Sequence, residues 1–271
     1  MPRDHAAMHI PPIGASRFVL MALVVVTSAV GLAACGGGAG REAAVSADRS
    51  APVRSDGVAT EAEALQTRFV AVVDAVSPAV VEIRTSVGLG SGIVFDSRGD
   101  IVTNAHVVAG SRRFLVRLSD GRRLRATLVG VDSDHDLAVV RVAGTSPAPA
   151  RFGDSRNVRV GQLALAIGNP LGLASSVTQG IVSSTGRRVS EGDGVTLDSA
   201  LQTSAAINPG NSGGALVDLD GRVIGIPTLA AIDPQLGDTA APGIGFAIAS
   251  NQVTAVARRI IASSGGRPGT G

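Results

Sequence analysis

Short runs of β-forming residues, separated by turn residues, recur from Pro78 to Ser250, and this pattern constrains the fold more than any other feature. The runs form two groups of about six, with a break near Ala148–Val158. Turn signals such as Ser119-Asp120-Gly121 lie between runs. A parallel sheet needs long crossovers, usually helical, and none is visible. The sequence therefore predicts an all-β protein made of two packed antiparallel six-stranded barrels.

The predicted boundaries follow from these runs. In the first barrel, at about residues 78–147, the predicted strands are Ala79–Arg84, Gly92–Phe95, Ile101–Thr103, Phe114–Leu118, Arg123–Val131 and Leu137–Val142. In the second, at about residues 158–250, they are Leu163–Ile167, Ser176–Ser184, Leu197–Thr203, Ala215–Val217, Val223–Leu229 and Gly243–Ile248. Helical spacing of apolar residues predicts short terminal helices over Glu61–Val76 and Asn251–Ile261.

The N-terminal segment has the features of an export signal. A stretch of 17 apolar or small residues, Phe18–Ala34, precedes Cys35, the single cysteine of the chain. A lone cysteine cannot form an intramolecular disulfide, and this segment resembles a lipoprotein signal in which Cys35 is acylated. We expect a signal peptide over 1–34, a flexible tether over 35–60 and a disordered tail over 263–271. An uncleaved single membrane anchor is the alternative, and both interpretations place the protein outside the cytoplasm.

Composition argues against nucleic acid as a partner. The net charge is +2, only 2 % of the residues are aromatic, and there is no Trp or Tyr to stack on bases. Arginine pairs such as Arg112-Arg113, Arg122-Arg123 and Arg187-Arg188 are short and separated by acids. We interpret them as solvated turns. The sequence also indicates no metal and no other cofactor.

Three segments carry residues suited to nucleophilic catalysis. His106 follows an apolar run, Asp136 precedes another, and Ser212 lies within Gly210-Asn211-Ser212-Gly213-Gly214. A serine hydroxyl needs an imidazole to take its proton, and a carboxylate fixes the tautomer of that imidazole. The order His, Asp, Ser is that of the chymotrypsin-type triad. The glycines permit the amides of Gly210 and Ser212 to point at one oxyanion.

The chain from Gly90 to Ser250 resembles the protease domain of the HtrA/DegP family of trypsin-like serine proteases. The resemblance rests on Gly90-Ser91-Gly92, Thr103-Asn104-Ala105-His106-Val107-Val108, Asp136-Leu137-Ala138, Ala166-Ile167-Gly168-Asn169-Pro170, Gln202-Thr203-Ser204-Ala205-Ala206-Ile207-Asn208, Gly210-Asn211-Ser212-Gly213-Gly214-Ala215-Leu216 and Gly243-Ile244-Gly245-Phe246-Ala247-Ile248. It implies a chymotrypsin-like fold over 61–262 and a serine endopeptidase with His106 as base, Asp136 orienting it and Ser212 attacking. It also implies that Asn211 shapes the oxyanion loop.

The resemblance further implies a substrate pocket formed by Ala206, Ile207 and Leu229. An aspartate six residues before the nucleophile selects Lys or Arg in trypsin, and Ala206 occupies that position here. We therefore expect cleavage after small aliphatic residues. Pro227 departs from the asparagine usual in relatives and removes a backbone donor beside the expected cleft.

The expected function is quality control of exported proteins, with unfolded polypeptides as substrates and a lipid anchor at the membrane. We expect no PDZ domain after the final helix, and a homotrimer stays open. Two alternatives remain: a chaperone-like module with weak catalysis, and a processing protease of narrow specificity. Degradation of unfolded casein, compared with a Ser212→Ala variant, would separate the first alternative from a protease.

Overall fold

The structure, a computed structural model, describes part of the chain. It covers residues 56–86, 88–169, 176–190, 196–208, 210–233 and 239–264, and for 56–59, 229–233 and 239–242 it describes the backbone alone. The predicted signal peptide, Cys35 and most of the predicted tether and tail lie outside these residues. No helix in the described part is long and apolar enough to span a membrane.

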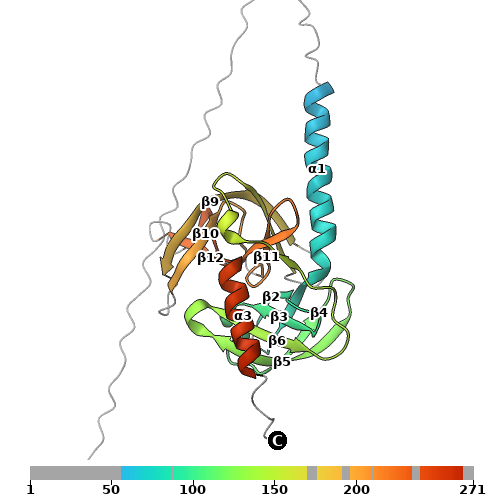
Figure 1. Cartoon of the computed structure of the whole chain (residues 1–271), viewed down its shortest axis with the longest axis vertical. Helices are drawn as coiled ribbons and strands as arrows, with labels where there is room; N and C mark the ends of the chain where they lie inside the picture. Colours follow the sequence, from blue (N-terminus) through green and yellow to red (C-terminus); the bar gives the residue numbers. More distant parts are fainter. Residues whose placement is uncertain are drawn as a thin grey trace, which may run out of the picture. The chain divides into compact units, whose positions relative to one another are not determined.

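Six antiparallel strands close into the first barrel, which lies beside the second in Figure 1. In barrel order they are β1 (Val80–Arg84), β2 (Leu89–Val94), β3 (Asp100–Thr103), β6 (Leu137–Val142), β5 (Arg123–Asp132) and β4 (Arg113–Arg117). Each pairs with its neighbours in sequence except where β3 pairs with β6 and β1 with β4. The pairing of β3 with β6 brings the residues after β3 close to those before β6.

The second half also contains six antiparallel strands joined into a ring. In order they are β11 (Ala215–Val217), β8 (Leu163–Gly168), β9 (Ser176–Ser190), β10 (Thr196–Thr203), β13 (Thr239–Ala249) and β12 (Arg222–Asp233), and β11 also pairs with β12. A two-residue strand, β7 (Arg151–Phe152), adds to β12 in parallel. The all-β prediction is confirmed, although β7 falls in the stretch predicted to be a break because two residues give no periodic signal.

Helices differ from the prediction mainly at their ends. They are α1 (Asp56–Val76), α2 (Ala105–Val108) and α3 (Ser250–Ser264), with 3₁₀ turns η1 (Ser77–Ala79), η2 (Ser133–His135) and η3 (Ser155–Asn157). α1 begins five residues before Glu61, inside the segment predicted as tether. α2 was not predicted, since a single helical turn is too short to show a period. The arginine pairs lie only partly in turns: Arg112 and Arg122 precede strands, whereas β4 begins at Arg113, β5 begins at Arg123, and Arg187-Arg188 lies within β9.

Side-chain alternation along the strands produces three apolar clusters. One fills the first barrel, including Val81, Ile83 and Val140, and a smaller one fills the second. The largest lies between the barrels and takes the alternate residues, such as Val80, Val139 and Ile167. The run Leu137–Val142 is therefore apolar almost throughout because β6 is buried on both faces.

α3 returns from the second barrel and packs on β5, β6 and β12 (Figure 1). Its buried face includes Val253, Val256 and Ile260. A side chain at Gly130 would place its Cβ 2.8 Å from Ile260, so glycine permits this close approach. Arg259 forms an ion pair with Asp132. Burial by itself would raise the pKa of Asp132, but hydrogen bonds from His135 and Arg259 outweigh it and lower that pKa.

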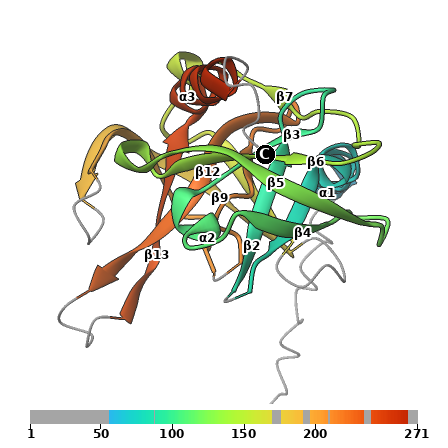
Figure 2. The same cartoon turned by 90° about the horizontal axis from the view of Figure 1, so that it is seen from below.

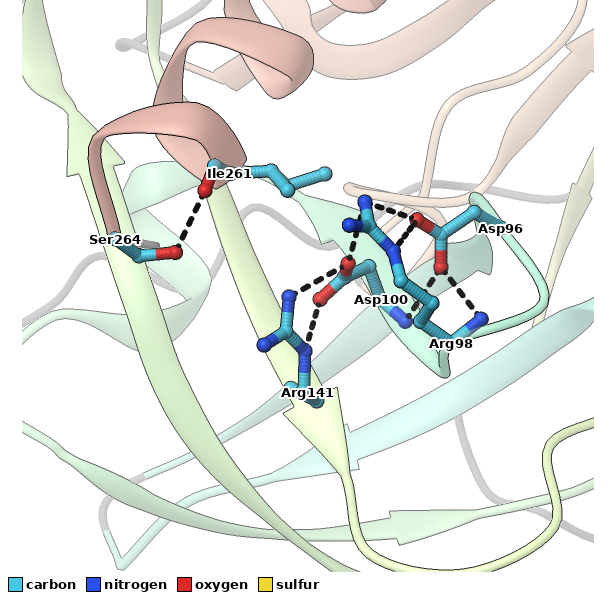
Figure 3. Close-up of polar contacts among 6 residues, drawn as sticks. All are labelled: Asp96, Arg98, Asp100, Arg141, Ile261 and Ser264. Atoms are coloured by element: carbon cyan, nitrogen blue, oxygen red, sulfur yellow. Dashed lines mark hydrogen bonds and ion pairs between the residues drawn. The ribbon is translucent and has the colours of Figure 1, made fainter. Parts of the chain in front are cut away.

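A carboxylate network closes the end of the first barrel near α3 (Figure 3). Asp100 is fully buried, and its two oxygens accept hydrogen bonds from Arg141 Nε at 2.7 Å and Nη2 at 2.8 Å. Arg98 Nη2 lies 3.5 Å from Asp100 and donates to Asp96 at 2.7 Å. The bidentate contact to Arg141 is thus the main compensation for burying this charge.

Replacing Arg141→Leu should lower the free energy of unfolding by about 2 kcal/mol, because the buried carboxylate loses two charged hydrogen bonds. The matched Arg98→Leu variant should lose at most about 1 kcal/mol, since the Arg98 side chain is 61 % exposed. Urea unfolding followed by circular dichroism measures both. Equal losses in the two variants would contradict this role for Arg141.

Candidate active site

The carboxylate of Asp136 is held where β6 begins. Asp136 ends the turn η2 in a left-handed conformation with φ of 48°, which aspartate tolerates better than most residues. Its backbone oxygen accepts hydrogen bonds from the amide of Ala105 at 3.1 Å and from Asn104 Nδ2 at 3.0 Å. These bonds tie the start of α2 to Asp136, as the pairing of β3 with β6 allows.

His106 is oriented by the same carboxylate. Its backbone amide donates to Asp136 Oδ1 at 3.1 Å, and its Nδ1 lies 2.9 Å from Oδ2. Because a carboxylate only accepts, this contact places the proton of a neutral imidazole on Nδ1 and leaves Nε2 as a base. The His106 side chain is 47 % exposed, whereas that of Asp136 is 4 % exposed. The base is therefore reachable, and the group that orients it is shielded.

Thr228, in β12, links the carboxylate to the serine, and sequence reasoning missed it. Its Oγ1 donates to Asp136 Oδ2 at 2.7 Å, and its backbone oxygen accepts from Ser212 Oγ at 3.0 Å. Thr228 is 2 % exposed. The available signal was a hydroxyl residue within the apolar run of residues 223–232 in this strand. One residue of the second barrel thus contacts two of the three predicted catalytic residues.

The loop around Ser212 needs its glycines. Gly210 and Gly213 have φ of 97° and 81°. A Cβ at Gly213 would lie 2.2 Å from the backbone oxygen of Ser91, so only glycine fits there. The backbone amides of Gly210 and Ser212 donate no hydrogen bond within the described part of the chain. The amide of Asn211, which lies between them, donates to the Asn208 carbonyl at 2.9 Å. Two amides of this loop are therefore available to a ligand.

Ser91, in β2 of the first barrel, holds this loop from the other side. Its amide donates to the Ser212 carbonyl at 2.9 Å, and its Oγ donates to the Gly210 carbonyl at 2.5 Å. The same Oγ accepts from the amide of Asn169 at 2.8 Å, and the Ser91 carbonyl accepts from Thr103 Oγ1 at 2.6 Å. Ser91 is fully buried. In the sequence, Ser91 stood out only as part of the motif Gly90-Ser91-Gly92, with no role of its own.

Two of the three predicted pocket residues lie next to the serine loop. The Ala206 carbonyl accepts from Asn211 Nδ2 at 3.5 Å, and the Ala206 residue is exposed. Ile207 is half-buried and lies against Gly245 of β13. The backbone of Leu229 pairs with Phe246, but its side chain is outside the described part, so its place in the pocket stays a prediction.

Pro227 lies in β12 opposite Ala247, and the pairing register shifts immediately after it. Its carbonyl accepts from the amide of Gly213 at 3.0 Å. The missing N–H thus coincides with an irregular point of the strand. Among the described residues, no group of three or more His, Cys, Asp or Glu side chains is arranged to hold a metal ion.

Comparison with known proteins agrees with this geometry. Residues 90–226, about half of the chain, match the trypsin-like peptidase domain model. The chain belongs to the trypsin-like peptidase family. Its fold, with two β-rich halves and few short helices, agrees with that of its HtrA-type structural neighbours.

The relatives of this trypsin-like peptidase are HtrA and DegP proteins, which confirms the resemblance inferred from sequence. A Haemophilus influenzae protein named probable periplasmic serine protease do/HhoA-like is 46 % identical over 176 residues, covering 64 % of this chain and 37 % of the relative. Serine endoprotease DegS of Escherichia coli is 44 % identical over 182 residues, covering 67 % and 50 %. The solved HtrA-type protease AlgW with tripeptide superposes with a TM-score of 0.64 at 41 % identity, covering 71 % of this chain and 63 % of that one. The chain thus spans between about a third and a half of the curated relatives it matches.

Replacing Thr228→Val should lower kcat about 10- to 100-fold, because the carboxylate that orients His106 loses one charged hydrogen bond. Thr228→Ser keeps the hydroxyl and should retain most of the activity. Steady-state cleavage of a fluorogenic peptide measures both variants. Equal activity of the Val and Ser variants would show that the hydroxyl does not position Asp136.

Proposed function

We propose that this chain is a serine endopeptidase that degrades unfolded or damaged exported polypeptides. The observation that carries the proposal is the chain of hydrogen bonds from His106 through Asp136 and Thr228 to Ser212. The names of the relatives, which include periplasmic serine proteases, support both the activity and a location outside the cytoplasm.

The proposed reaction begins when Ser212 Oγ turns its proton from the Thr228 carbonyl toward Nε2 of His106. Oγ attacks the substrate carbonyl carbon, and the proton moves to Nε2. The negative charge on the substrate oxygen is stabilised by the amides of Gly210 and Ser212. The carbon–nitrogen bond then breaks, and the leaving amine takes the proton from Nε2. Water then attacks the acyl carbon while its proton moves to Nε2, the ester bond to Ser212 Oγ breaks, and Oγ takes that proton back.

The carboxylate of Asp136 stabilises the imidazolium that forms in both halves of this reaction. Its burial strengthens the interaction, because little water screens the two charges. Ser91 supports the oxyanion loop, since its hydroxyl fixes the carbonyl of Gly210. Asn211 would shape the loop, because its backbone N–H donates a hydrogen bond to the Asn208 carbonyl and its Nδ2 donates to the Ala206 carbonyl.

Replacing Ser212→Ala should lower proteolysis of unfolded casein by about 10⁴- to 10⁶-fold while the fold is kept. Ser119→Ala changes an exposed turn serine and serves as the matched control. Gel analysis of casein and labelling by a fluorophosphonate probe are the measurements. Casein captured by the unaltered protein without being cleaved would instead support a chaperone-like module.

Cleavage should follow small aliphatic residues, because Ala206 offers no charge to pair with Lys or Arg and an unpaired buried cation is costly. The preference should be broad, since one methylene contributes only about 1–3 kcal/mol. Mass spectrometry of products from a peptide library measures it. Ala206→Asp should increase cleavage after Arg, and a dominant Arg, Lys or Glu preference in the unaltered protein would refute the pocket assignment.

We also propose that Cys35 is acylated and that the following tether holds the protease at a membrane. Replacing Cys35→Ala should release the protein into the soluble fraction, because the acyl chains supply the anchor. Gly36→Ala keeps the cysteine and serves as the control. Fractionation and intact mass measure the outcome, and a membrane-bound Cys35→Ala protein that retains residues 1–34 would support an uncleaved anchor instead.

A further inference from the structure

The outer face of the first barrel gathers five arginines on three adjacent strands. This set, the arginine face, comprises Arg84 of β1, Arg113 and Arg117 of β4, and Arg123 and Arg125 of β5. Figure 2 shows β4 and β5 running side by side. Strand register aligns the side chains: Arg117 lies between Glu82 and Arg123, and Leu115 lies between Arg84 and Arg125.

Alternation places these arginines on the outside of the barrel. Residues two apart along a strand share a face, and so do direct partners on neighbouring strands. The intervening residues Ile83, Phe114 and Val116 belong to the apolar cluster inside the barrel. All of the arginines are exposed except Arg117, which is half-buried. The face is therefore turned to the surroundings.

The charge on this face is poorly balanced within the protein. Its one carboxylate belongs to Glu82, which is 1 % exposed and accepts from Arg84 Nε at 3.0 Å. Five guanidinium groups and one carboxylate leave a net charge of +4. Arg113, Arg123 and Arg125 have no ion pair among the described residues.

The arrangement of charges indicates that the face suits an anionic partner. Arg117 and Arg123 lie directly opposite each other, an arrangement that destabilises a sheet unless the charges are neutralised. Beneath them, Arg117 Nε is a buried donor and Glu82 Oε2 a buried acceptor without a hydrogen-bond partner among the described residues. The cavity beside them, lined by Glu82, Arg84, Leu115, Arg117 and Arg123, is only about 70 Å³. It is too small for a metabolite, which favours a partner that presents many anions over an area.

We infer that the arginine face docks the protease unit onto anionic phospholipid headgroups. Guanidinium groups bind phosphate oxygens in pairs and keep their charge at any physiological pH. The choice of a lipid surface rests on the proposed anchor at Cys35. The 20 residues from Gly36 to Ser55 reach about 70 Å when extended, so the bilayer is accessible to the face. A lipid anchor combined with a basic patch gives stable membrane attachment.

The experiment places a reporter on the face itself. In the full chain carrying Cys35→Ala, Thr127→Cys introduces a single cysteine on β5, opposite Arg113. A fluorophore there is mixed with vesicles of phosphatidylcholine containing 30 % phosphatidylglycerol and a headgroup-labelled quencher lipid. A label at Val160→Cys, a residue that is 62 % exposed in the second half, is the positional control. Residues 1–34 are present in both proteins and so cannot explain a difference between them.

We expect quenching of the Thr127 label that exceeds that of the Val160 label and is lost at 0.5 M salt or without phosphatidylglycerol. Each arginine near an anionic surface strengthens binding about fivefold. A triple variant in which Gln replaces Arg113, Arg123 and Arg125 should therefore bind the vesicles about 100-fold more weakly. The charge-matched control replaces Arg151, Arg159 and Arg187 by Gln. Casein cleavage in solution should be unchanged in both triple variants, which separates this test from that of the catalytic proposal.

Three results would overturn the inference. One is equal quenching of the two labels, and another is equal weakening by the two triple variants. The third is a competition result in which polyglutamate or DNA displaces the protein from the labelled vesicles more effectively than unlabelled phosphatidylglycerol vesicles do, when the competitors are compared at equal concentrations of anionic groups. That result would assign the face to an acidic polymer instead. Each of these outcomes can be measured even if Cys35 is not acylated in the natural protein, because the labelled proteins carry Cys35→Ala.

Discussion

One buried carboxylate connects the two halves of this protein at the site. Asp136 accepts hydrogen bonds from the amide and ring of His106 in the first half and from Thr228 in the second. A buried anion without such donors would be strongly unfavourable, so its partners must stay close to it. Because Thr228 also accepts from Ser212, the need to stabilise one charge helps set the relative position of base and nucleophile.

Ser91 makes the second polar connection between the halves. Its amide and hydroxyl donate hydrogen bonds to two carbonyls of the nucleophile loop. Ile93, two residues further along β2, belongs to the apolar cluster between the barrels. Apolar burial there stabilises the association without direction, whereas the hydrogen bonds fix which groups face each other. Gly213 completes the loop because a Cβ there would clash with the Ser91 carbonyl of β2, and Gly210 adopts the positive φ that glycine favours.

Much of the fold could be predicted because it depends on local pattern. Alternation and turn residues located the strands, and β6 and β11 have the predicted bounds. The elements that were missed are short or lack a period, such as α2 and β7. Thr228 and Ser91 were missed because a single hydroxyl in a strand has no distinctive local context. Their partners lie 92 and 119 residues away in sequence.

The sequence by itself determined the two sets of strands and predicted His106, Asp136 and Ser212 as catalytic residues, since spacing and residue chemistry are properties of short segments. Only the tertiary structure decided which side chains meet. It paired β3 with β6, placed Thr228 between Asp136 and Ser212, and brought arginines from β1, β4 and β5 onto one face. The physical reason is that strand register and barrel closure depend on the simultaneous burial of many distant residues, which no short segment encodes.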